Sequence, residues 1–502
     1  MVVGVQHGTI VMQTGIVPNW ADGMKEISMH SLCHTKLKSI NEYFELPPSR
    51  IYVCDLNHNA PKLINEARRN GIAVYGSAGR KPSAGKWISV CASGKFLPTT
   101  YWIKFSTGTI LLNYSSFDTK KELVPEHEMK RVVTQIEEFE PSLEWSTSNR
   151  LIEKKIPLFL EKQCELTNTE YKYYDYLDVA LRGGANHVMR NQENIQLETH
   201  IDYHQIYAYV MSKEEFPFGD PIEIEGYFEH PFAIYALEPG TMARVKKDGY
   251  PLIPIGQDYT GMAGANGEWF DAGTTLQFIS DVDLNIMIRN YEFKDNYIGI
   301  CATLYYPNAF KGSEWFKPIV DEIYTKRKLY KGQPEERFYK ILNEVLPGHF
   351  ERRSYYGGFW VKDFQPNKDS TTPHRYNPKI GIFITAYARR ELDKLLHQFP
   401  HDKVIGYDTD CVFFAGSRNA LPYSVLDMFG DNPGQVHEDG YYRNVYHKAS
   451  KSYYGFDAVT GESFTKIAGM SKSGYAWAWN KDMREYELKE VNKNEERQTF
   501  TL

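Results

Sequence analysis

The chain has 502 residues, of which 42% are hydrophobic and 24% are charged, and its formal net charge is −6. This length and composition fit an ordinary globular protein with sizeable cores and about three domains. The slightly acidic balance carries no overall signature of nucleic-acid binding, so contacts with phosphate would have to come from local basic patches.

The cysteine pattern argues against a zinc ribbon or a disulfide framework and suits a reducing compartment, because no pair has Cys-x-x-Cys spacing. No apolar run reaches the length of a membrane span, and the N-terminus lacks the basic-then-apolar shape of a signal peptide. We therefore expect a soluble, cytoplasmic protein with no membrane partner. The six cysteines are Cys33, Cys54, Cys91, Cys164, Cys301 and Cys411.

The first part of the chain has an α/β pattern. A helix over 61–70 ends at Gly71, a typical helix stop. A polar, helix-prone stretch then runs from about 122 to 160 and is broken at Pro141. Strands are predicted at 2–5, 10–12, 51–55, 102–105 and 109–114.

The second part begins with a short strand over 197–201 that Asp202 closes, followed by a helix over 205–214. Short strands with Gly and Pro turns fill 219–307, and helices return at 315–343 and 384–398. A final β-rich portion starts at 441. The predicted domains are 1–160, a linker over 161–190, a central domain over 191–440 and a C-terminal region over 441–502.

The stretch Val404–Phe414 places Asp408-Thr409-Asp410 between two apolar runs, which predicts a hairpin with the aspartates at its tip. Aspartate is common in turns for other reasons, so the motif alone is weak. Asp202, at a strand end before a helix start, can face this hairpin in a shared sheet. Three convergent carboxylates can hold two Mg²⁺ or Mn²⁺ ions for phosphoryl transfer.

Several ordered motifs from about residue 140 onward resemble those of the family B DNA polymerases, specifically the small protein-primed type of bacteriophages. Asp202–Ala208 resembles the first polymerase motif, Asp408–Asp410 the third, and 383–389 the helix before the third. The remaining matches are Arg182-Gly183-Gly184 with the template-contacting linker motif, 217–221 and 281–284 with parts of the insertion that touches the priming protein, Lys451-Ser452-Tyr453 with the primer-holding motif, and 466–470 with the segment after it.

The resemblance implies an α+β or α/β multidomain protein with a right-hand polymerase fold of palm, fingers and thumb, preceded by an RNase H-like exonuclease-type domain. It implies a DNA primer-template and dNTPs as partners, a terminal (priming) protein at 219–307, and the host-cell cytoplasm as location. Asp202, Asp408 and Asp410 would be catalytic metal ligands, and Tyr207 the steric gate that excludes a ribose 2′-hydroxyl. Contacts with DNA would fall to Arg182, Gly183, Gly184, Thr409, Lys451 and Tyr453.

The second polymerase motif departs from the family pattern, and two stretches compete for it. Residues 340–350 keep a lysine, Lys340, which we prefer for the triphosphate because a point charge on a helix suits phosphate. Residues 353–359 keep a tyrosine, Tyr356, which suits stacking on the base pair. Lys326 and Arg327 are second candidates for the triphosphate, in a segment with six basic residues against two Glu over 326–340. Such a run is commonly a solvated helix face.

The N-terminal region departs further. Residues 55–71 resemble the second exonuclease block but carry Asn59 where the family has a metal-binding aspartate, and an amide is a poorer ligand than a carboxylate. The first block, Asp-x-Glu, has no counterpart, and Tyr173, Tyr174 and Asp178 give no secure match to the third. We predict an exonuclease fold that lacks proofreading. The short segment 359–382 predicts reduced processivity.

Two alternatives stay open. One is a polymerase-fold DNA-binding replication protein with weak or no catalysis, which the degenerate second motif favours. The other is a primer-independent primase-polymerase. The three convergent carboxylates weigh against the first alternative. They repel one another, and in a protein without catalysis they would have no evident structural use.

Overall fold

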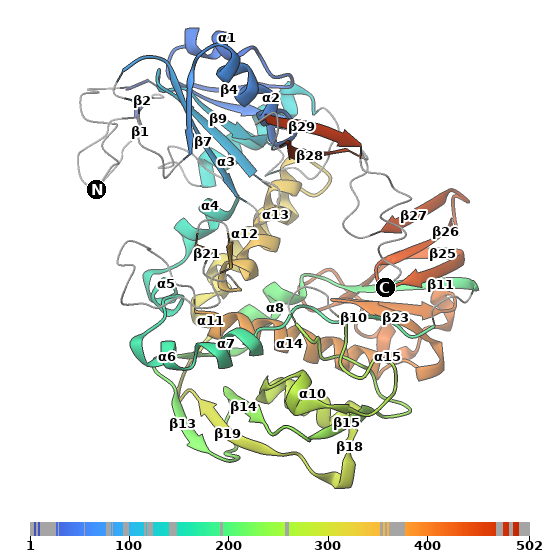
Figure 1. Ribbon diagram of the computed structural model, residues 1–502. Coiled ribbons are helices and arrows are strands. Elements are labelled where there is room, and N and C mark those ends of the chain that lie inside the picture. The colour runs from blue at the N-terminus through green and yellow to red at the C-terminus, as the bar shows by residue number, and fades with distance from the viewer. Residues whose placement is uncertain are drawn as a thin grey trace.

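Two large β-sheets organise the chain (Figure 1), a six-stranded N-terminal sheet and a seven-stranded central sheet. The structure is a computed structural model. It describes residues 30–54, 56–76, 82, 84–93, 100–114, 117, 124–139, 148–190, 194–256, 261–351 and 377–467, with short strands at 5–6, 9–10, 27–28, 355–356, 359–360, 475–480 and 485–490.

The N-terminal sheet mixes parallel and antiparallel strands. Its order is β4 (His30–His34), β5 (Ser49–Val53), β9 (Ile110–Asn113), β8 (Thr100–Phe105), β7 (Trp87–Ser93) and β6 (Ala73–Gly76). The pairs β4–β5, β5–β9 and β6–β7 are parallel, and the meander β7–β8–β9 is antiparallel. Three strands predicted here are therefore confirmed with shifted ends.

Helix α2 (Leu56–Arg69) packs on this sheet, and α1 (Ile40–Glu45) begins at a capping box of Ser39 and Glu42. The helix predicted over 61–70 starts earlier, so Pro61 lies inside it. Gly71 follows the helix with φ +69°, a left-handed conformation that favours glycine, and the predicted stop is confirmed. Shorter strands β1 (Val5–Gln6), β2 (Thr9–Ile10) and β3 (Ile27–Ser28) form a separate sheet.

The predicted helix-prone stretch over 122–160 holds α3 (Glu126–Phe139), α4 (Ser148–Lys155) and the start of α5 (Leu158–Gln163). Two more helices, α6 (Asn168–Lys172) and α7 (Tyr174–Ala180), follow in the predicted linker. Thr167 caps α6 by accepting from the backbone N–H of Glu170 at 3.1 Å, and the Glu170 side chain answers with a bond to the Thr167 N–H at 3.0 Å. This reciprocal cap fixes where α6 begins.

The central sheet is antiparallel throughout. Its order is β10 (Asn186–Val188), β23 (Val404–Asp408), β24 (Cys411–Ala415), β11 (Asn194–Tyr203), β25 (Val436–Ala449), β26 (Ser452–Asp457) and β27 (Ser463–Ile467). Asp202 lies inside β11 rather than after a strand over 197–201, which corrects that prediction. The predicted boundary at 440/441 falls within β25, and β26 and β27 continue the same sheet.

One face of the central sheet packs on two helices, α8 (Ile206–Lys213) and α14 (Lys379–Leu396). Ile201, Val412 and Phe414 from the sheet are buried in one cluster with Val210 of α8 and Phe383 of α14. Apolar burial of this extent is what holds the sheet on its helices. The helix predicted at 384–398 is confirmed with an earlier start.

The segment 219–307 forms small sheets, as predicted, and also holds helices that were not predicted. The longer α-helix is α10 (Asp281–Asn290), which Ser280 caps by accepting from Asp283 N–H at 3.1 Å. The other elements are β13 (Ile222–Glu225), β14 (Ala233–Leu237), β15 (Met242–Val245), β16 (Phe270–Asp271), α9 (Ala272–Thr275), β17 (Phe278–Ser280), β18 (Tyr291–Phe293), η2 (Lys294–Asn296) and β19 (Ile300–Tyr305), and the paired strands β12 (Glu215–Phe218) and β20 (Asn308–Lys311) flank the segment.

A helical hairpin of α12 (Lys317–Leu329) and α13 (Pro334–Phe350) lies between the two large sheets (Figure 1). The helix predicted over 315–343 is thus two helices, because Gly332 turns the chain with φ +77° and Pro334 starts the second. The remaining elements are α11 (Gly312–Trp315), β21 (Tyr355–Tyr356), β22 (Phe359–Trp360), η3 (His401–Lys403), η4 (Arg418–Ala420), α15 (Tyr423–Leu426), β28 (Tyr475–Asn480) and β29 (Glu485–Glu490).

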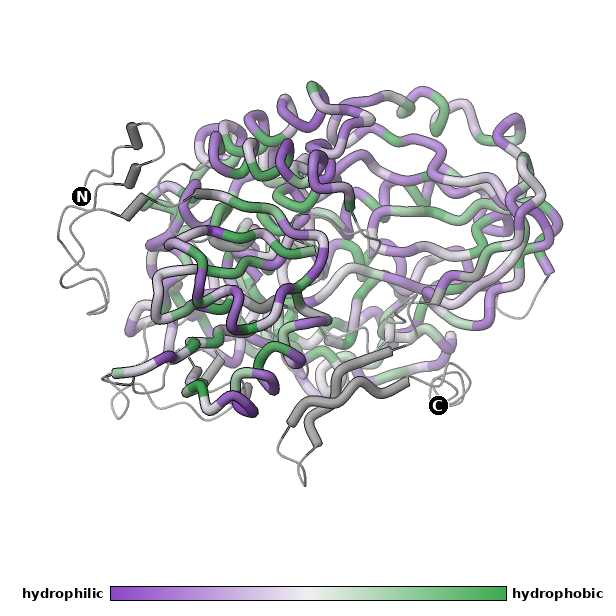
Figure 2. Tube along the Cα trace, turned by 90° about the horizontal axis from the view of Figure 1, so that it is seen from above, coloured by the Kyte–Doolittle hydropathy of each residue, from purple (hydrophilic) through white to green (hydrophobic). Residues whose placement is uncertain are grey.

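The C-terminal strands β28 and β29 contact α2 of the N-terminal region (Figure 1). Short hydrophobic segments alternate with hydrophilic ones along the described chain (Figure 2). In the part of the chain that the structure describes, no helix combines the length and apolarity that a membrane crossing requires.

Candidate metal and nucleotide site

The sheet register brings the three predicted aspartates to one place. Asp202 of β11 is paired with Cys411 of β24, and Cys411 is also paired with Asp408 of β23. The backbone N–H of Tyr203 donates to the carbonyl of Asp410 at 3.0 Å. Residues more than 200 positions apart in the sequence therefore share one edge of the central sheet.

The Asp-Thr-Asp turn is held tightly by its own backbone and by the linker segment. Thr409 has φ +62°, and its N–H donates to the carbonyl of Ala185 at 2.7 Å, while the N–H of Asp410 donates to the carbonyl of Asp408 at 2.7 Å. A Cβ on Gly184 would lie 2.9 Å from the Thr409 side chain. Gly184 must lack a side chain for the linker to pack on this turn, so it positions the aspartates.

The carboxylates crowd one another. Burial raises the pKa of Asp202, and the nearby Asp410 and Asp439 raise it further. Burial also raises the pKa of Asp410, with Asp408 as the next cause. The Oδ1 atom of Asp202 is buried without a hydrogen-bond partner among the described residues. A divalent cation would remove both the repulsion and the missing contact, so these residues fit such an ion.

Asp408 differs from the other two, because the Lys451 ammonium lies 2.8 Å from its Oδ1 and the Thr409 hydroxyl donates to the same atom at 3.1 Å. Lys451 follows β25 in a left-handed conformation, with φ +58°. The structure thus brings Lys451 of the predicted primer-holding motif to the aspartates. It also gives Asp408 a cation of its own.

Tyr453, from the same motif, is buried instead. Its ring packs against Phe413 at 5.6 Å and His447 at 4.9 Å between centroids, and only 4% of the residue is exposed. Such a ring stabilises the sheet by packing. The contact of Tyr453 with DNA stays a prediction, and the structure shows this side chain in the interior of the sheet.

Arg182, for which a contact with DNA is predicted, is buried as well. It is 1% exposed, and its guanidinium donates to four backbone carbonyls, those of Pro254, Ile255, Leu276 and Phe278, at 2.7–3.2 Å. The neighbouring Gly183 carbonyl accepts from Arg389 at 2.6 Å. Arg182 and Gly183 therefore join the linker to the 219–307 segment and to α14.

Four of the five predicted nucleotide-binding residues lie on three helices. Tyr207 is the second residue of α8, the helix that follows the strand of Asp202, and it is partly buried against the main hydrophobic core. Lys326 and Arg327 lie on α12, and Lys340 is an exposed residue of α13 that lies 3.9 Å from Glu344. The Tyr356 side chain is outside the described residues.

Among the predicted cations, Arg327 has an electrostatic effect on a residue next to the site. Burial lowers the pKa of His204 and His437 lowers it further; Asp431 raises it, and the charges of Arg327 and Lys331 lower it. His204 lies two residues after Asp202. The Tyr324 hydroxyl on α12 also donates to the carbonyl of Asp431, close to the start of β25. Lys331 was missed by the sequence analysis, although it belongs to the same basic run.

The exonuclease-type block lies on the N-terminal sheet and α2. Asn59 is a half-buried residue of α2, and β4 carries no Asp or Glu. Asp55 lies outside the described residues. Tyr174 and Asp178 are one turn apart on α7, where the Tyr174 hydroxyl donates to Asp178 at 3.4 Å. The structure therefore offers no carboxylate from β4, among the described strands, to partner α2.

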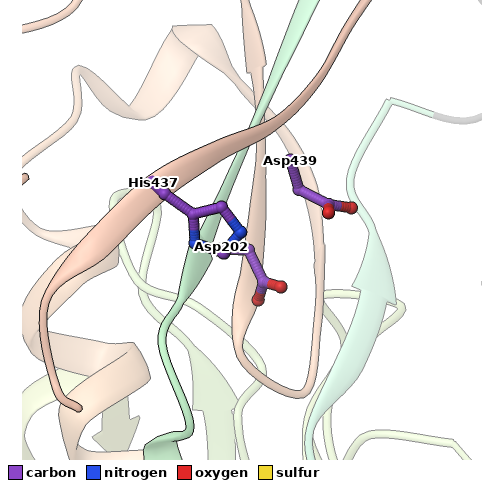
Figure 3. A group of neighbouring side chains, drawn as sticks. All are labelled: Asp202, His437 and Asp439. Atoms are coloured by element: carbon purple, nitrogen blue, oxygen red, sulfur yellow. The ribbon is translucent and has the colours of Figure 1, made fainter. Parts of the chain in front are cut away.

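Two site residues were missed by sequence reasoning, His437 and Asp439 of β25. His437 is paired with Asp202 across the sheet, and one ligand atom each of Asp202, His437 and Asp439 lies within 4.8 Å of the others (Figure 3). His437 and Asp439 are two residues apart, so on a strand they share one face, and this spacing could have revealed them in the sequence. The predicted start of the β-rich portion at 441 left them outside the strand that carries them.

Neither protein-family models nor curated proteins match the chain, but solved structures do. Phi29 DNA polymerase bound to primer-template DNA is 17% identical, covers 87% of each chain and superposes with a TM-score of 0.64. The complex of the same polymerase with primer-template DNA and incoming nucleotide superposes with a TM-score of 0.63, and its complex with single-stranded DNA with 0.61. The chain therefore has a mixed α/β multidomain fold like that of Phi29 DNA polymerase.

Proposed function

We propose that the chain is a template-directed DNA polymerase of the protein-primed family B type, which transfers nucleotides with two divalent metal ions at Asp202, Asp408 and Asp410. The observation that carries the proposal is the convergence of Asp202 with the Asp-Thr-Asp turn on one sheet edge, with the buried Asp202 Oδ1 lacking a partner. The likeness in fold to a DNA polymerase supports the same function.

When bound, divalent ions would supply charge neutralisation for the triphosphate and activation of the attacking 3′-hydroxyl. The chain itself supplies positioning. Asp202 and Asp410 would hold the ions, and Lys451 would keep the Asp408 carboxylate in place while its ammonium faces the primer end. Tyr207, at the start of α8, would select the deoxyribose by steric exclusion.

The triphosphate would approach from the side of the α12–α13 hairpin. Arg327 and Lys331 provide positive charge beside His204, and Lys326 and Lys340 extend the same basic segment. Cations on a helix suit phosphate oxygens, Arg through bidentate bonds and Lys as a point charge. Gly184 and Thr409 would contact the template strand through their backbone, which the turn already orders.

The absence of proofreading and the use of a priming protein are parts of the same proposal. The first is supported by Asn59 in the position of a metal-binding aspartate and by the lack of Asp or Glu in β4. The second rests on the resemblance of the 219–307 segment alone. Incubation of labelled single-stranded DNA with enzyme and Mg²⁺ should give no 3′–5′ shortening; trimming that persists in Asp410→Asn would overturn the first part.

The central test is extension of a labelled DNA primer on a template with dNTPs and either Mg²⁺ or Mn²⁺. Wild type should extend the primer, and Asp410→Asn should not, although it binds the primer-template. Asp427→Asn, an exposed aspartate at the end of α15, is the matched control and should behave as wild type. If wild type binds DNA but adds no nucleotide with either ion, the protein is a non-catalytic relative and the proposal fails.

A further inference from the structure

A second group of metal-ligating side chains lies on β25, beside the aspartates that the sequence predicts. Asp202 and His437 face one another across the β11–β25 pair, and Asp439 follows two residues later on the same strand. One ligand atom from each lies within 4.8 Å of the others, and Figure 3 shows the three side chains next to one another. Donors opposite one another on a six-coordinate ion at about 2.2 Å stand about 4.4 Å apart, so small adjustments would close this group on one ion.

The fold builds this arrangement with a β-bulge. His200 is paired with Gly440 and Ile201 with Glu438, so Asp439 is the extra residue on β25. A bulge redirects a side chain and increases the local twist. Gly440 follows the extra residue, and the ring of Tyr442 fills the space that a Cβ on Gly440 would need. Asp439 is therefore directed to the site by the backbone.

Two atoms of the group are without partners. Asp202 Oδ1 and His437 Nδ1 are both buried and form no hydrogen bond in the described part of the chain. Leaving a buried polar atom without a hydrogen bond destabilises the folded state. The imidazole is also held in place, since His204 stacks on it with centroids 3.9 Å apart and planes 8° apart. The His437 ring is therefore stacked in place, with a buried Nδ1 that can accept a ligand.

We propose that Asp202, His437 and Asp439 form a binding site for one divalent transition-metal ion, with Mn²⁺ preferred over Mg²⁺. Imidazole nitrogen favours transition metals, whereas Mg²⁺ selects all-oxygen ligands and keeps its water. Mn²⁺ accepts both carboxylate oxygen and imidazole nitrogen. This inference rests on the proposed function for its role, because Asp202 would serve nucleotide transfer, but the binding itself can be measured without DNA or nucleotide.

The other aspartates differ from this group in their partners. Asp408 is neutralised by Lys451 at 2.8 Å. Among the described residues, the compact set of three ligands includes neither Asp408 nor Asp410. The two-ion site would therefore be asymmetric, with one ion bound by two carboxylates and an imidazole, and the other by the carboxylates of the Asp-Thr-Asp turn.

The test is Mn²⁺ binding to the full chain, without DNA or nucleotide, followed by the electron paramagnetic resonance signal of free Mn²⁺. Wild type should bind Mn²⁺ and resist displacement by equimolar Mg²⁺, and pulsed spectra should show coupling to an imidazole ¹⁴N. His437→Asn should lower the Mn²⁺ affinity by about tenfold or more and abolish the ¹⁴N coupling. Asp439→Asn, at an exposed position, should lower the affinity while the protein stays folded.

The controls are His127→Asn, an exposed histidine of α3, and Asp410→Asn, and both should keep the ¹⁴N coupling. Wild-type affinity and coupling in His437→Asn, or equal competition by Mg²⁺ in wild type, would overturn the inference. Its failure can be told from failure of the proposed function. Primer extension with an unchanged metal preference in His437→Asn refutes only the site, whereas ¹⁴N-coupled Mn²⁺ in a wild-type protein that adds no nucleotide refutes only the polymerase.

Discussion

Charged residues occur in two different states in this molecule. At the edge of the central sheet, Asp202 and Asp410 are crowded by other carboxylates, and Asp202 Oδ1 has no partner among the described residues. Elsewhere in the same region, several buried charges are paired with opposite charges. The contrast teaches that the fold does not need the crowded carboxylates in the way that it needs these ion pairs.

The paired group is extensive. Arg389 of α14 forms a bidentate pair with Asp283 of α10, at 2.9 and 2.7 Å, with both side chains at most 1% exposed. Lys379 lies 2.8 Å from Glu170, also buried. Glu198 accepts from His200 and His447 in the centre of the sheet. These pairs connect α14, the 219–307 segment and the linker that supports the Asp-Thr-Asp turn.

Breaking the paired group should have the largest effect on stability. Asp283→Asn should lower the free energy of unfolding by about 3–5 kcal/mol, because it leaves the Arg389 guanidinium buried without its counter-ion. Urea denaturation followed by circular dichroism measures this. Asp321→Asn, which breaks the exposed pair with Lys317 at 2.6 Å, is the control and should cost less than about 1 kcal/mol. Equal costs for both variants would erase the distinction between the two states.

Removing a crowded carboxylate should instead reduce activity strongly and leave stability unchanged or higher. Asp410→Asn should reduce nucleotide incorporation by more than about 100-fold, since even groups that only support metal ligands contribute 10- to 100-fold. The same variant should match or exceed wild type in urea, because it relieves repulsion with Asp202 and Asp408. Rapid-quench assays and denaturation give the two readouts. A variant that is both inactive and strongly destabilised would mean that the carboxylate serves the fold.

Asp281 of α10 is a buried carboxyl group whose effect on stability should depend on pH. Burial raises the pKa of Asp281 to about 7, and its Oδ1 has no partner among the described residues. Between about pH 4, the ordinary pKa of aspartate, and pH 7, the folded state then binds more protons than the unfolded state. The free energy of unfolding therefore falls as the pH rises, by at most about 1.4 kcal/mol per pH unit. Asp281→Asn should remove this slope. Urea midpoints at pH 5 and 7.5 that shift equally in variant and wild type would contradict the assignment.

Lys340 should show the smallest effect on stability. Its ion pair with Glu344 is exposed, so Lys340→Ala should change the free energy of unfolding by no more than about 0.5 kcal/mol. If the lysine binds the triphosphate, the KM for dNTP should rise while stability stays constant. Arg327→Ala gives the comparison, because Arg327 has the electrostatic link to His204. A KM that rises only in Arg327→Ala would transfer the role to α12.

Much of the central site could be predicted because its signals are local. The apolar runs around Asp408-Thr409-Asp410 specify a hairpin by themselves, and the helix stop at Gly71 depends on one residue. Helix α10 was missed although Ser280 and Asp283 have the spacing of an N-terminal cap. The capping pattern was present in the sequence, but the segment was predicted as strands because strands flank it on either side.

Other features depend on partners that are distant in the sequence. Arg182 has the same local sequence whether it faces DNA or the carbonyls of Leu276 and Phe278, almost a hundred residues later. His437 and Asp439 join the site through a bulge that exists only when β25 pairs with β11. Tyr453 is buried by Phe413 and His447, which belong to other strands. Pairing of this kind is fixed by tertiary structure and cannot be predicted from local pattern.

The most direct test of the central claim is whether the template selects the nucleotide. Four primer-templates that differ only in the first unpaired template base would each be given one dNTP at a time, with Mn²⁺ or Mg²⁺. The account predicts that wild type adds the complementary nucleotide on each template and that Asp410→Asn adds none. Addition of the same nucleotide on every template, or no addition by a wild-type protein that binds the DNA, would contradict it.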